Sequence, residues 1–353
     1  MIRKNMLNNR QNAILEQIEQ KGVLSARDIW VNLATDQLKI SKLTVIRDLN
    51  ILLKERIICK TGKGRTTRYS SLFVHPLLKL IDSEKYFATP LDQRIIKTNF
   101  NWDIFAQLKN IFTADEITEL TKMNNDFRAR KAAFPASAIK KELERLTIEL
   151  SWKSSQMEGN TYTLLDTELL LTKEIKASGH SAQEVDMILG HKNALDYILS
   201  NPIKFTNLNA DAIRTVHSLI VKNLGISEDW RKILVGITGT AYKPIDNQWK
   251  IQEAVEDSCV AINNEPAPVV KAFLAGALIA YIQPFVDGNK RTGRLITDAI
   301  LWAHDWCPLS YRSIDEAEYK KAMLLIYEQN NFYLFKQLFV EQYKFAVKNY
   351  FGR

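Results

Sequence analysis

Cysteine is scarce in this chain, which has three among 353 residues. Cys59, Cys259 and Cys307 lie far apart and form no C-x-x-C pair. The sequence therefore predicts neither a disulfide framework nor a zinc site built on cysteines. We expect all three to be buried thiols.

No hydrophobic run is long enough to cross a membrane. The most apolar stretch, Val269 to Ile282, has 14 residues and contains Lys271, whereas a spanning helix needs about 20. The N-terminal residues MIRKNMLNNRQ also lack the apolar segment of a signal peptide. These absences predict a cytoplasmic protein with no membrane partner.

The chain has an ordinary globular composition, with 46% hydrophobic and 25% charged residues. Its length predicts two or three domains. We place the predicted domains at residues 1–72, 73–136 and 137–353. The middle segment has helical periodicity but no cluster of reactive side chains, and we interpret it as a packed connector.

All of the excess positive charge lies in the first domain. Residues 1–70 contain 14 Lys+Arg and 6 Asp+Glu, a net charge of +8, and the remainder has 34 of each sign. A basic segment beside a neutral body indicates a polyanionic partner of that segment, most often nucleic acid.

The first domain shows three helical patterns followed by two short strands. Ser25 and Ser41 are expected to cap the second and third helices. Strands are predicted at Ile57 to Lys60 and Thr66 to Ser70, around a Gly-Lys-Gly turn. The positions predicted to be buried in the helices are Ile14, Leu15, Ile18, Ile29, Trp30, Leu33, Leu43, Ile46, Leu49 and Leu53.

This arrangement resembles a winged helix-turn-helix domain, and SKLTVIRDLNILLKERII resembles a DeoR-type recognition helix. The resemblance implies that the third helix enters the major groove of DNA and that the wing contacts phosphate. A winged fold used only for protein contacts is the alternative, but the charge segregation favours DNA. The implied DNA-binding residues are Lys42, Thr44, Arg47, Lys63, Arg65 and Arg68.

From about residue 137 the chain is predicted to be mostly helical. The exception is Leu234 to Ile251, where side chains alternate and a turn is expected at Pro244 to Asn247, so a β-hairpin is predicted. The fold class is therefore mainly α.

A loop rich in charge and glycine follows the apolar helix and reads YIQPFVDGNKRTGRL. Pro284 ends the helix, Gly288 permits a tight turn, and a new helix is expected from Asn289. Such a loop presents backbone N–H groups and the positive end of a helix dipole to phosphate. A P-loop is excluded because Arg294 and Leu295 stand where Lys and Ser/Thr are required.

The loop resembles the Fic (Fido) family, whose motif is H-P-F-x-[D/E]-G-N-[G/K]-R-x-x-R. The resemblance covers roughly residues 137–353, and the predicted hairpin resembles the family's target-positioning flap. It implies a helical bundle that binds ATP with magnesium and, in active members, transfers AMP to a hydroxyl group of a target protein. The matching positions are Pro284, Phe285, Asp287, Gly288, Asn289, Lys290, Arg291 and Arg294.

The resemblance also implies a role for each loop residue. Asp287 would hold Mg²⁺, Arg294 the γ-phosphate, and Asn289 with the loop amides the α-phosphate region. Arg291 would steady the loop and the phosphates. The implied nucleotide-binding residues are Gly288, Asn289, Lys290, Arg291, Gly293 and Arg294.

An upstream segment, Ser154 to Gly159, resembles the family's inhibitory motif [S/T]-x-x-x-E-[G/N]. We expect it on an inhibitory helix at about residues 148–160. The resemblance implies that Glu158 pairs with Arg294 and so keeps this arginine from the γ-phosphate. A Glu that merely caps an exposed helix is the alternative.

The family's catalytic histidine falls on Gln283. A carboxamide cannot accept the proton of a target hydroxyl, and loss of a general base typically lowers the rate about 10²- to 10⁴-fold. His217 and His304 are other histidines of this domain, but their patterns indicate packing.

Three interpretations remain open at this point. The chain is a weak or specialised protein adenylyltransferase, a catalytically inactive nucleotide sensor that controls DNA binding, or a structural remnant. The intact phosphate ligands disfavour the remnant. The expected partners are ATP, DNA, an unidentified target protein and, by analogy, a second copy of the chain.

Overall fold

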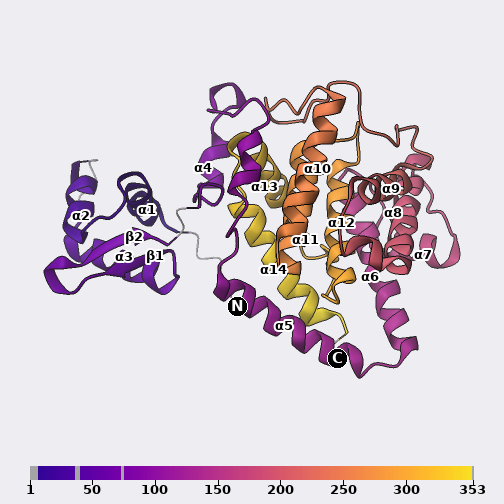
Figure 1. Ribbon diagram of the computed structural model, residues 1–353, viewed down its shortest axis with the longest axis horizontal. Helices are drawn as coiled ribbons and strands as arrows, with labels where there is room; N and C mark the ends of the chain where they lie inside the picture. Colours follow the sequence, from indigo (N-terminus) through magenta and orange to yellow (C-terminus); the bar gives the residue numbers. More distant parts are fainter. Residues whose placement is uncertain (1–6, 36–39, 73–74, 352–353) are drawn as a thin grey trace. The chain divides into compact units, whose positions relative to one another are not determined.

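The computed structural model describes residues 7–35, 40–72 and 75–351, which form two compact units (Figure 1). One unit ends at Tyr86 and the other begins at Phe87. The domain limit predicted after residue 72 adjoins residues 73–74, which lie outside the described ranges. No described helix combines the length and hydropathy of a membrane-spanning segment.

The first unit is a three-helix domain with a two-stranded antiparallel sheet, as predicted. Asn8 and Ser41 accept hydrogen bonds from backbone N–H groups and so begin the first and third helices. In the sheet Ile58 pairs with Ser71 and Thr61 with Arg68. The elements are α1 (Asn9–Lys21), α2 (Ala26–Thr35), α3 (Lys42–Lys54), β1 (Ile58–Thr61) and β2 (Arg68–Ser71).

The buried face of α3 differs from the prediction. Leu43 is 68% exposed, and Ile46 and Leu53 are only half-buried. Aliphatic residues lie on both sides of this helix, so periodicity alone does not select the buried side. A charge also lies on the inner side, because Asp48 is buried in an ion pair with Arg10. The buried residues of α3 are Val45, Asp48, Leu49 and Leu52.

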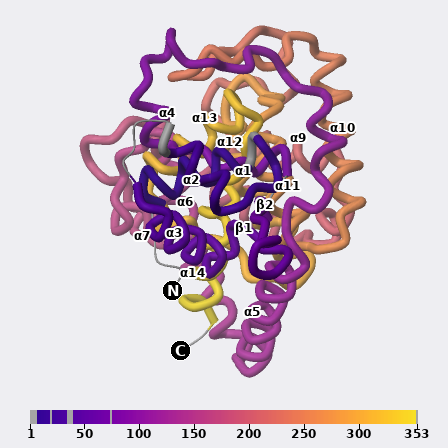
Figure 2. The backbone as a smooth tube through the Cα atoms, turned by 90° about the vertical axis from the view of Figure 1, so that its left-hand side faces the viewer, coloured from indigo at the N-terminus to yellow at the C-terminus, as the bar shows by residue number. Residues whose placement is uncertain are grey.

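The second unit is a helical bundle. Figure 1 shows α10, α11 and α12 running side by side, with α13 and α14 on one flank and α8 and α9 on the other. In Figure 2 α5 extends along the lower part of this unit, where it contacts α14. The helices are α5 (Ala114–Ala132), α6 (Ala136–Gln156), α7 (Leu164–Lys173), α8 (Ala182–Ser200), α9 (Ala210–Val221), α10 (Gln248–Asn264), α11 (Pro268–Ile282), α12 (Asn289–Ala303), α13 (Glu316–Gln329) and α14 (Tyr333–Asn349). A short helix, α4 (Ser83–Ala88), crosses the boundary between the units.

Helices α11 and α12 cross closely because glycines meet at their contact. A Cβ atom on Gly293 would lie 3.0 Å from the Gly276 carbonyl oxygen, and one on Gly276 would lie 2.6 Å from Thr297 Oγ1. The structure therefore places Gly293, which was predicted to bind the nucleotide, in a helix crossing. Its physical role is to let two backbones approach.

The β-hairpin predicted at residues 234–251 is wrong. The segment before α10 is an extended loop whose backbone pairs with another segment, since Lys243 N–H donates to the Thr98 carbonyl at 2.7 Å. The Asn247 side chain accepts hydrogen bonds from the N–H groups of Trp249 and Lys250 and starts α10. The residues expected to form the second strand are therefore wound into a helix.

The three cysteines are free thiols. Cys259 and Cys307 are buried, as expected, whereas Cys59 is only half-buried on β1.

Candidate functional site

The loop between α11 and α12 begins at Gln283. This residue ends α11 in the left-handed conformation, with φ 53° and ψ 58°. Gly288, at φ 80°, precedes the first residue of α12, and glycine adopts that conformation without steric cost. The backbone thus turns sharply at both ends of the loop, and the N-terminus of α12 faces the loop.

The Gln283 carboxamide is almost fully hydrogen-bonded and 8% exposed. Its Nε2 donates to the Ala280 carbonyl at 2.6 Å and to the Tyr327 hydroxyl at 3.1 Å. Its Oε1 accepts from Asn289 Nδ2 at 3.0 Å. The amide therefore holds the end of α11 to the loop and offers no titratable base.

The side chain of Asn289 forms hydrogen bonds with other residues of the loop. Its Oδ1 accepts from the Phe285 N–H at 2.8 Å, and its Nδ2 donates to the Phe285 carbonyl at 2.8 Å as well as to Gln283. The side chain is 4% exposed. Asn289 thus fixes the loop's shape, and this role was not evident from the spacing of the motif.

Asp287 and Arg291 form an ion pair across the turn, with Asp287 Oδ2 3.1 Å from Arg291 Nη2. The Asp287 side chain is 63% exposed, but that of Arg291 is 1% exposed. Arg291 Nε and Nη1 are buried and have no hydrogen-bond partner among the described residues. Buried donors of this kind are costly unless they find an acceptor, so the site favours an anion at this point.

Arg294 is enclosed by residues of α6, of the turn that follows α6, and of α13. Its Nε donates to Ser154 Oγ at 2.8 Å and its Nη2 to the Ser154 carbonyl at 2.9 Å. Its Nη2 also lies 3.0 Å from Glu158 Oε1, and its guanidinium carbon lies 5.4 Å from the centre of the Tyr319 ring. These contacts leave the guanidinium side chain 1% exposed.

Glu158 is shared by two cations. Its Oε1 binds Arg294, and its Oε2 lies 2.7 Å from Lys290 Nζ. Burial opposes ionisation of Glu158, but the attraction of Arg294 and Lys290 outweighs it and lowers the pKa of the carboxyl group. Glu158 is consequently a charged competitor for the arginine.

The helix that carries this motif is longer than predicted. It is α6, which begins at Ala136 and ends at Gln156, so Glu158 lies in the turn just past its end. The Glu158 N–H donates to the Ser155 carbonyl at 3.0 Å, and Gly159 follows at φ 93°. The turn, rather than the helix itself, directs the carboxylate toward α12.

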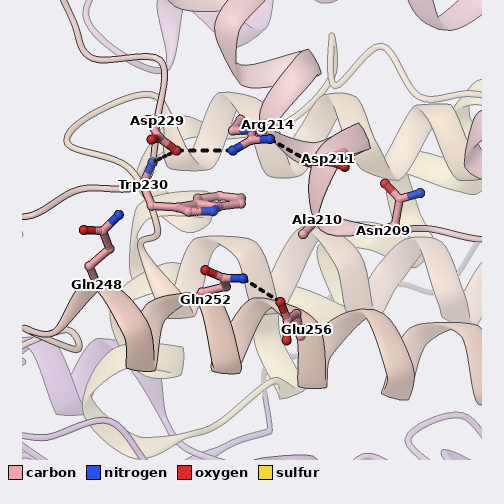
Figure 3. A pocket seen from close by; sticks show the side chains of 9 residues that line it. All are labelled: Asn209, Ala210, Asp211, Arg214, Asp229, Trp230, Gln248, Gln252 and Glu256. Carbon is pink, nitrogen blue, oxygen red and sulfur yellow. Dashed lines mark hydrogen bonds and ion pairs between the residues drawn. The ribbon is translucent and has the colours of Figure 1, made fainter.

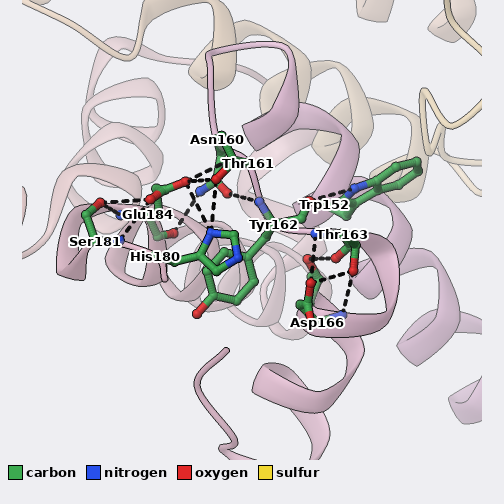
Figure 4. Close-up of polar contacts among 10 residues, drawn as sticks. Trp152, Asn160, Thr161, Tyr162, Thr163, Asp166, His180, Ser181 and Glu184 are labelled. Carbon is green, nitrogen blue, oxygen red and sulfur yellow. Dashed lines mark hydrogen bonds and ion pairs between the residues drawn. The ribbon is translucent and has the colours of Figure 1, made fainter. Parts of the chain in front are cut away.

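A polar clasp holds the chain immediately after Glu158 (Figure 4). Glu184, near the N-terminus of α8, accepts from Thr161 N–H at 2.9 Å through Oε1 and from Ser181 N–H at 2.9 Å through Oε2. The Thr161 hydroxyl also donates to Oε1, and this bond, followed by the two backbone bonds, lowers the pKa of Glu184 to about 2. Trp152 Nε1 also donates to the Tyr162 carbonyl at 3.1 Å. We did not predict this clasp, although the Ser181 to Glu184 spacing is typical of a capping box.

His217 supports the loop from α9. Its ring stacks on Phe285 with centroids 3.5 Å apart, and its Nε2 lies 3.0 Å from the Asp287 carbonyl. Burial lowers the pKa of His217 to about 4, although hydrogen bonds with the Asp287 and Glu228 carbonyls raise it. The imidazole is therefore neutral near pH 7 and is occupied by the loop backbone.

His191 and His304 also lie in this unit, without a catalytic arrangement. Burial and then the charges of Arg291 and Arg294 lower the pKa of His191, which has no hydrogen-bond partner among the described residues. Burial likewise lowers the pKa of His304, which follows the last residue of α12. Neither residue belongs to the loop between α11 and α12.

The residues predicted to contact DNA lie mostly on the surface of the first unit. Lys42, Arg47, Lys63, Arg65 and Arg68 are exposed. Thr44 is half-buried, and its hydroxyl is 2.9 Å from the Ser41 hydroxyl at the start of α3. Thr44 therefore takes part in the cap of α3 and is only partly accessible at the surface.

Comparison with known proteins finds a family match within each unit. Residues 207–301 match the model of the Fic/DOC family, and residues 10–68 match the model of the DeoR-like helix-turn-helix domain. Together with the helical fold, these matches confirm the two resemblances stated from the sequence.

Curated relatives are similar over more than half of the chain. They include proteins named protein adenylyltransferase Fic from Nematostella vectensis, 26% identical over 238 residues, and from Drosophila willistoni, 26% identical over 209 residues. The matches cover 66% and 56% of this chain and 54% and 41% of those proteins. The chain thus spans about half the length of the curated relatives it matches.

Solved structures share the fold. Fic-1 from C. elegans has a TM-score of 0.56 at 18% identity, covering 66% of this chain and 69% of that one. A Fic domain containing signaling protein from Bacteroides thetaiotaomicron has a TM-score of 0.53 at 18% identity, and the match covers 66% of this chain and 96% of that one.

Proposed function

Because the chain carries a Fic/DOC family domain behind a DeoR-like helix-turn-helix domain, we propose that it is an autoinhibited nucleotide-binding protein of the adenylyltransferase type. It would slowly transfer AMP from ATP to a hydroxyl group of a target protein, with release of pyrophosphate. The names of the curated relatives support this reaction class. The observation that carries the proposal is the ion pair between Glu158 and Arg294, on an arginine that is 1% exposed.

The loop supports binding of a triphosphate at the N-terminus of α12. Backbone N–H groups and the helix dipole attract phosphate there. The buried Arg291 nitrogens that lack a partner would gain acceptors from phosphate oxygens. Arg294 would bind the γ-phosphate once Glu158 has moved away.

Magnesium fits the same loop through Asp287. Its exposed carboxylate uses Oδ2 for Arg291, and Oδ1 has no partner among the described residues. Protein sites usually hold Mg²⁺ with one or two carboxylates together with substrate phosphates, so this single carboxylate suffices when ATP is bound. The ion would neutralise part of the phosphate charge.

Glu158 restrains the site by competing for Arg294. The carboxylate and the γ-phosphate require the same guanidinium, and Lys290 holds the second carboxylate oxygen at 2.7 Å. An Arg–carboxylate pair is strong where water is excluded. ATP would therefore bind with its γ-phosphate displaced until this contact opens.

Gln283 limits turnover. It occupies the family's histidine position, and its amide hydrogens are bound to Ala280 and Tyr327. Transfer would then proceed without a general base, with the proton passing to solvent. The expected rate is about 10²- to 10⁴-fold below that of a histidine-bearing site.

A second candidate function is a nucleotide sensor that controls DNA binding by the winged domain. It is favoured by the same full hydrogen bonding of Gln283 and by the engagement of His217 with the loop backbone. In this alternative Glu158 sets nucleotide occupancy and no transfer occurs.

AMP incorporation from labelled ATP distinguishes the two functions. We expect Glu158→Gly to give weak labelling and Glu158→Gly with Gln283→His to give about 10²-fold more or better. Asp287→Ala in the double variant is the matched control and should abolish the signal. Labelling of equal strength with Gln and His would refute the argument about the base, and no labelling in any variant would favour the sensor.

Nucleotide binding is tested separately by thermal unfolding. Mg-ATP should raise the melting temperature of the native chain because a bound ligand stabilises the folded state. Glu158→Gly should enlarge the increase, because Arg294 is then available to the γ-phosphate and ATP binds more tightly. Glu174→Gly, at the end of α7, changes an equivalent charge away from the loop and should leave the increase as in the native chain. Melting curves that Mg-ATP does not move in any variant would exclude the proposed site.

A further inference from the structure

A cavity of about 480 Å³ opens between the start of α9 and the first half of α10 (Figure 3). Its lining is mainly polar and includes Asp211, Arg214, Asp229, Trp230 and Glu256. None of these residues belongs to the loop after α11. The cavity is therefore separate from the candidate nucleotide loop.

The cavity is negatively charged and has unused acceptors. Three carboxylates and one guanidinium line it, a net charge of 1 − 3 = −2. Arg214 binds Asp211 Oδ1 at 2.6 Å and approaches Asp229 Oδ1 at 3.5 Å, while Glu256 Oε1 accepts from Gln252 at 2.8 Å. Each carboxylate keeps one oxygen with no partner among the described residues, and all three residues are exposed to solvent.

Trp230 adds an aromatic wall and a free donor. Figure 3 shows its indole between Arg214 and Gln252 in the lining. The ring is 6% exposed, and no acceptor for its indole N–H lies among the described residues. A polypeptide in the cavity would supply that acceptor through a backbone carbonyl.

An organic cation suits this chemistry better than a metal ion. The described residues contain no group of three or more His, Cys, Asp or Glu arranged to hold a metal. A guanidinium is planar and weakly hydrated and binds carboxylates in a bidentate manner, and it stacks well against aromatic rings. Among protein side chains these properties belong to arginine.

We propose that this cavity binds an arginine side chain of the target protein. The inference rests on the proposed transferase function for the identity of the partner, but the binding step needs neither nucleotide nor transfer. An arginine held there would place the attached target chain against the loop of residues 231–247 that leads into α10.

The cavity is also connected to the candidate nucleotide loop. Trp230 stacks on Phe285 with centroids 4.8 Å apart. The next residue, Arg231, donates from its backbone N–H to the Pro284 carbonyl at 3.0 Å and from Nε to the Gln283 carbonyl at 2.6 Å. A target bound at Trp230 would therefore contact the residues that shape the loop.

The test follows the Trp230 indole N–H in a nitrogen-15 correlation spectrum of the full chain, with the resonance assigned by Trp230→Phe. Arginine amide should shift this resonance in a saturable manner. Citrulline amide, which is neutral and has nearly the same shape, should not. Glu256→Gln should weaken the arginine response roughly two- to five-fold, as expected for a partly exposed ion pair.

The control is Glu253→Gln, which removes an exposed charge from α10 outside the cavity. Equal responses to the two amides, or to the two glutamine variants, would overturn the proposal. If arginine amide binds while labelled ATP gives no transfer, the cavity stands and the transferase function fails. If transfer occurs while the resonance does not move, only the arginine site fails.

Discussion

Some side chains of the candidate site form hydrogen bonds with the loop backbone and so fix its shape. His217 lies between the Glu228 carbonyl at 3.4 Å and the Asp287 carbonyl at 3.0 Å. Asn289 fixes the loop from the opposite side through Phe285. A loop built in this way presents its amides in a defined geometry before any ligand arrives, which reduces the ordering cost of binding.

Burial of His217 makes stability sensitive to acid. Its folded pKa is about 4 and its ordinary value 6.5, so the unfolded chain takes up a proton as the pH falls below 6.5 while the folded chain stays neutral until about 4. The free energy of unfolding should fall across this window, with a slope of up to about 1.4 kcal/mol per pH unit from this residue. Above pH 6.5 the free energy of unfolding does not depend on the titration of His217.

Denaturant titrations at several pH values measure the effect. His217→Gln lacks a titrating ring, so the decline between pH 6.5 and 4 should be shallower than in the native chain, although the variant is less stable at pH 7 because the stack on Phe285 is lost. Parallel declines in the two proteins would show that His217 is not the residue that takes up the proton.

Some residue assignments could be made from the sequence and others could not. The contact between Glu158 and Arg294 follows from two motifs and is present at 3.0 Å. The position of Gly293 could not be inferred, because only the packing of α11 on α12 shows that it faces Gly276. Contacts across the fold, such as Gln283 with Tyr327, leave no local pattern in the chain.

Helix packing in the second unit relies on close backbone approaches. A Cβ atom on Gly190 in α8 would lie 2.7 Å from the Ile220 carbonyl oxygen in α9. The contact involves backbone, so it cannot be relieved by moving a flexible side chain. Helix α9 in turn supports the loop through His217 and lines the cavity through Arg214.

We expect Gly190→Ala to destabilise the chain by about 1–3 kcal/mol, as overpacking usually does. Alanine is intrinsically the better helix former, so a loss would come from the α8–α9 contact alone. Gly236→Ala is the control, since a Cβ atom there meets nothing within 4 Å. Equal melting temperatures for the two variants would contradict the close approach.

Helices were easier to predict than the connection before α10. The apolar run of α11 and the caps of α2 and α3 at Ser25 and Ser41 act locally, so their signals lie in the sequence itself. The alternation before α10 also suggested a strand, but Lys243 bonds to Thr98, which is distant in sequence. Asn247 caps the helix, and its capping signal should have outweighed the alternation.

The full chain joins a basic domain to a neutral one, and each carries its own candidate site. The first unit exposes Arg47 on α3 and Lys63, Arg65 and Arg68 around the wing. Exposed cations of this kind bind phosphate by releasing condensed counterions, which makes affinity depend steeply on salt. We therefore propose DNA as the partner of this unit.

Salt dependence tests this proposal in the intact chain. Affinity for duplex DNA should fall linearly on a double-logarithmic plot against salt concentration, and Arg65→Ala should reduce the slope by about 1 because one phosphate contact is lost. Arg47→Ala should cost about 1–3 kcal/mol and relax sequence preference if it reads a base edge. Lys122→Ala removes an exposed charge from α5 in the other unit and should leave both slope and affinity as they are. A flat salt response, or equal effects of Arg65→Ala and Lys122→Ala, would mean that the positive charge of this domain serves a partner other than DNA.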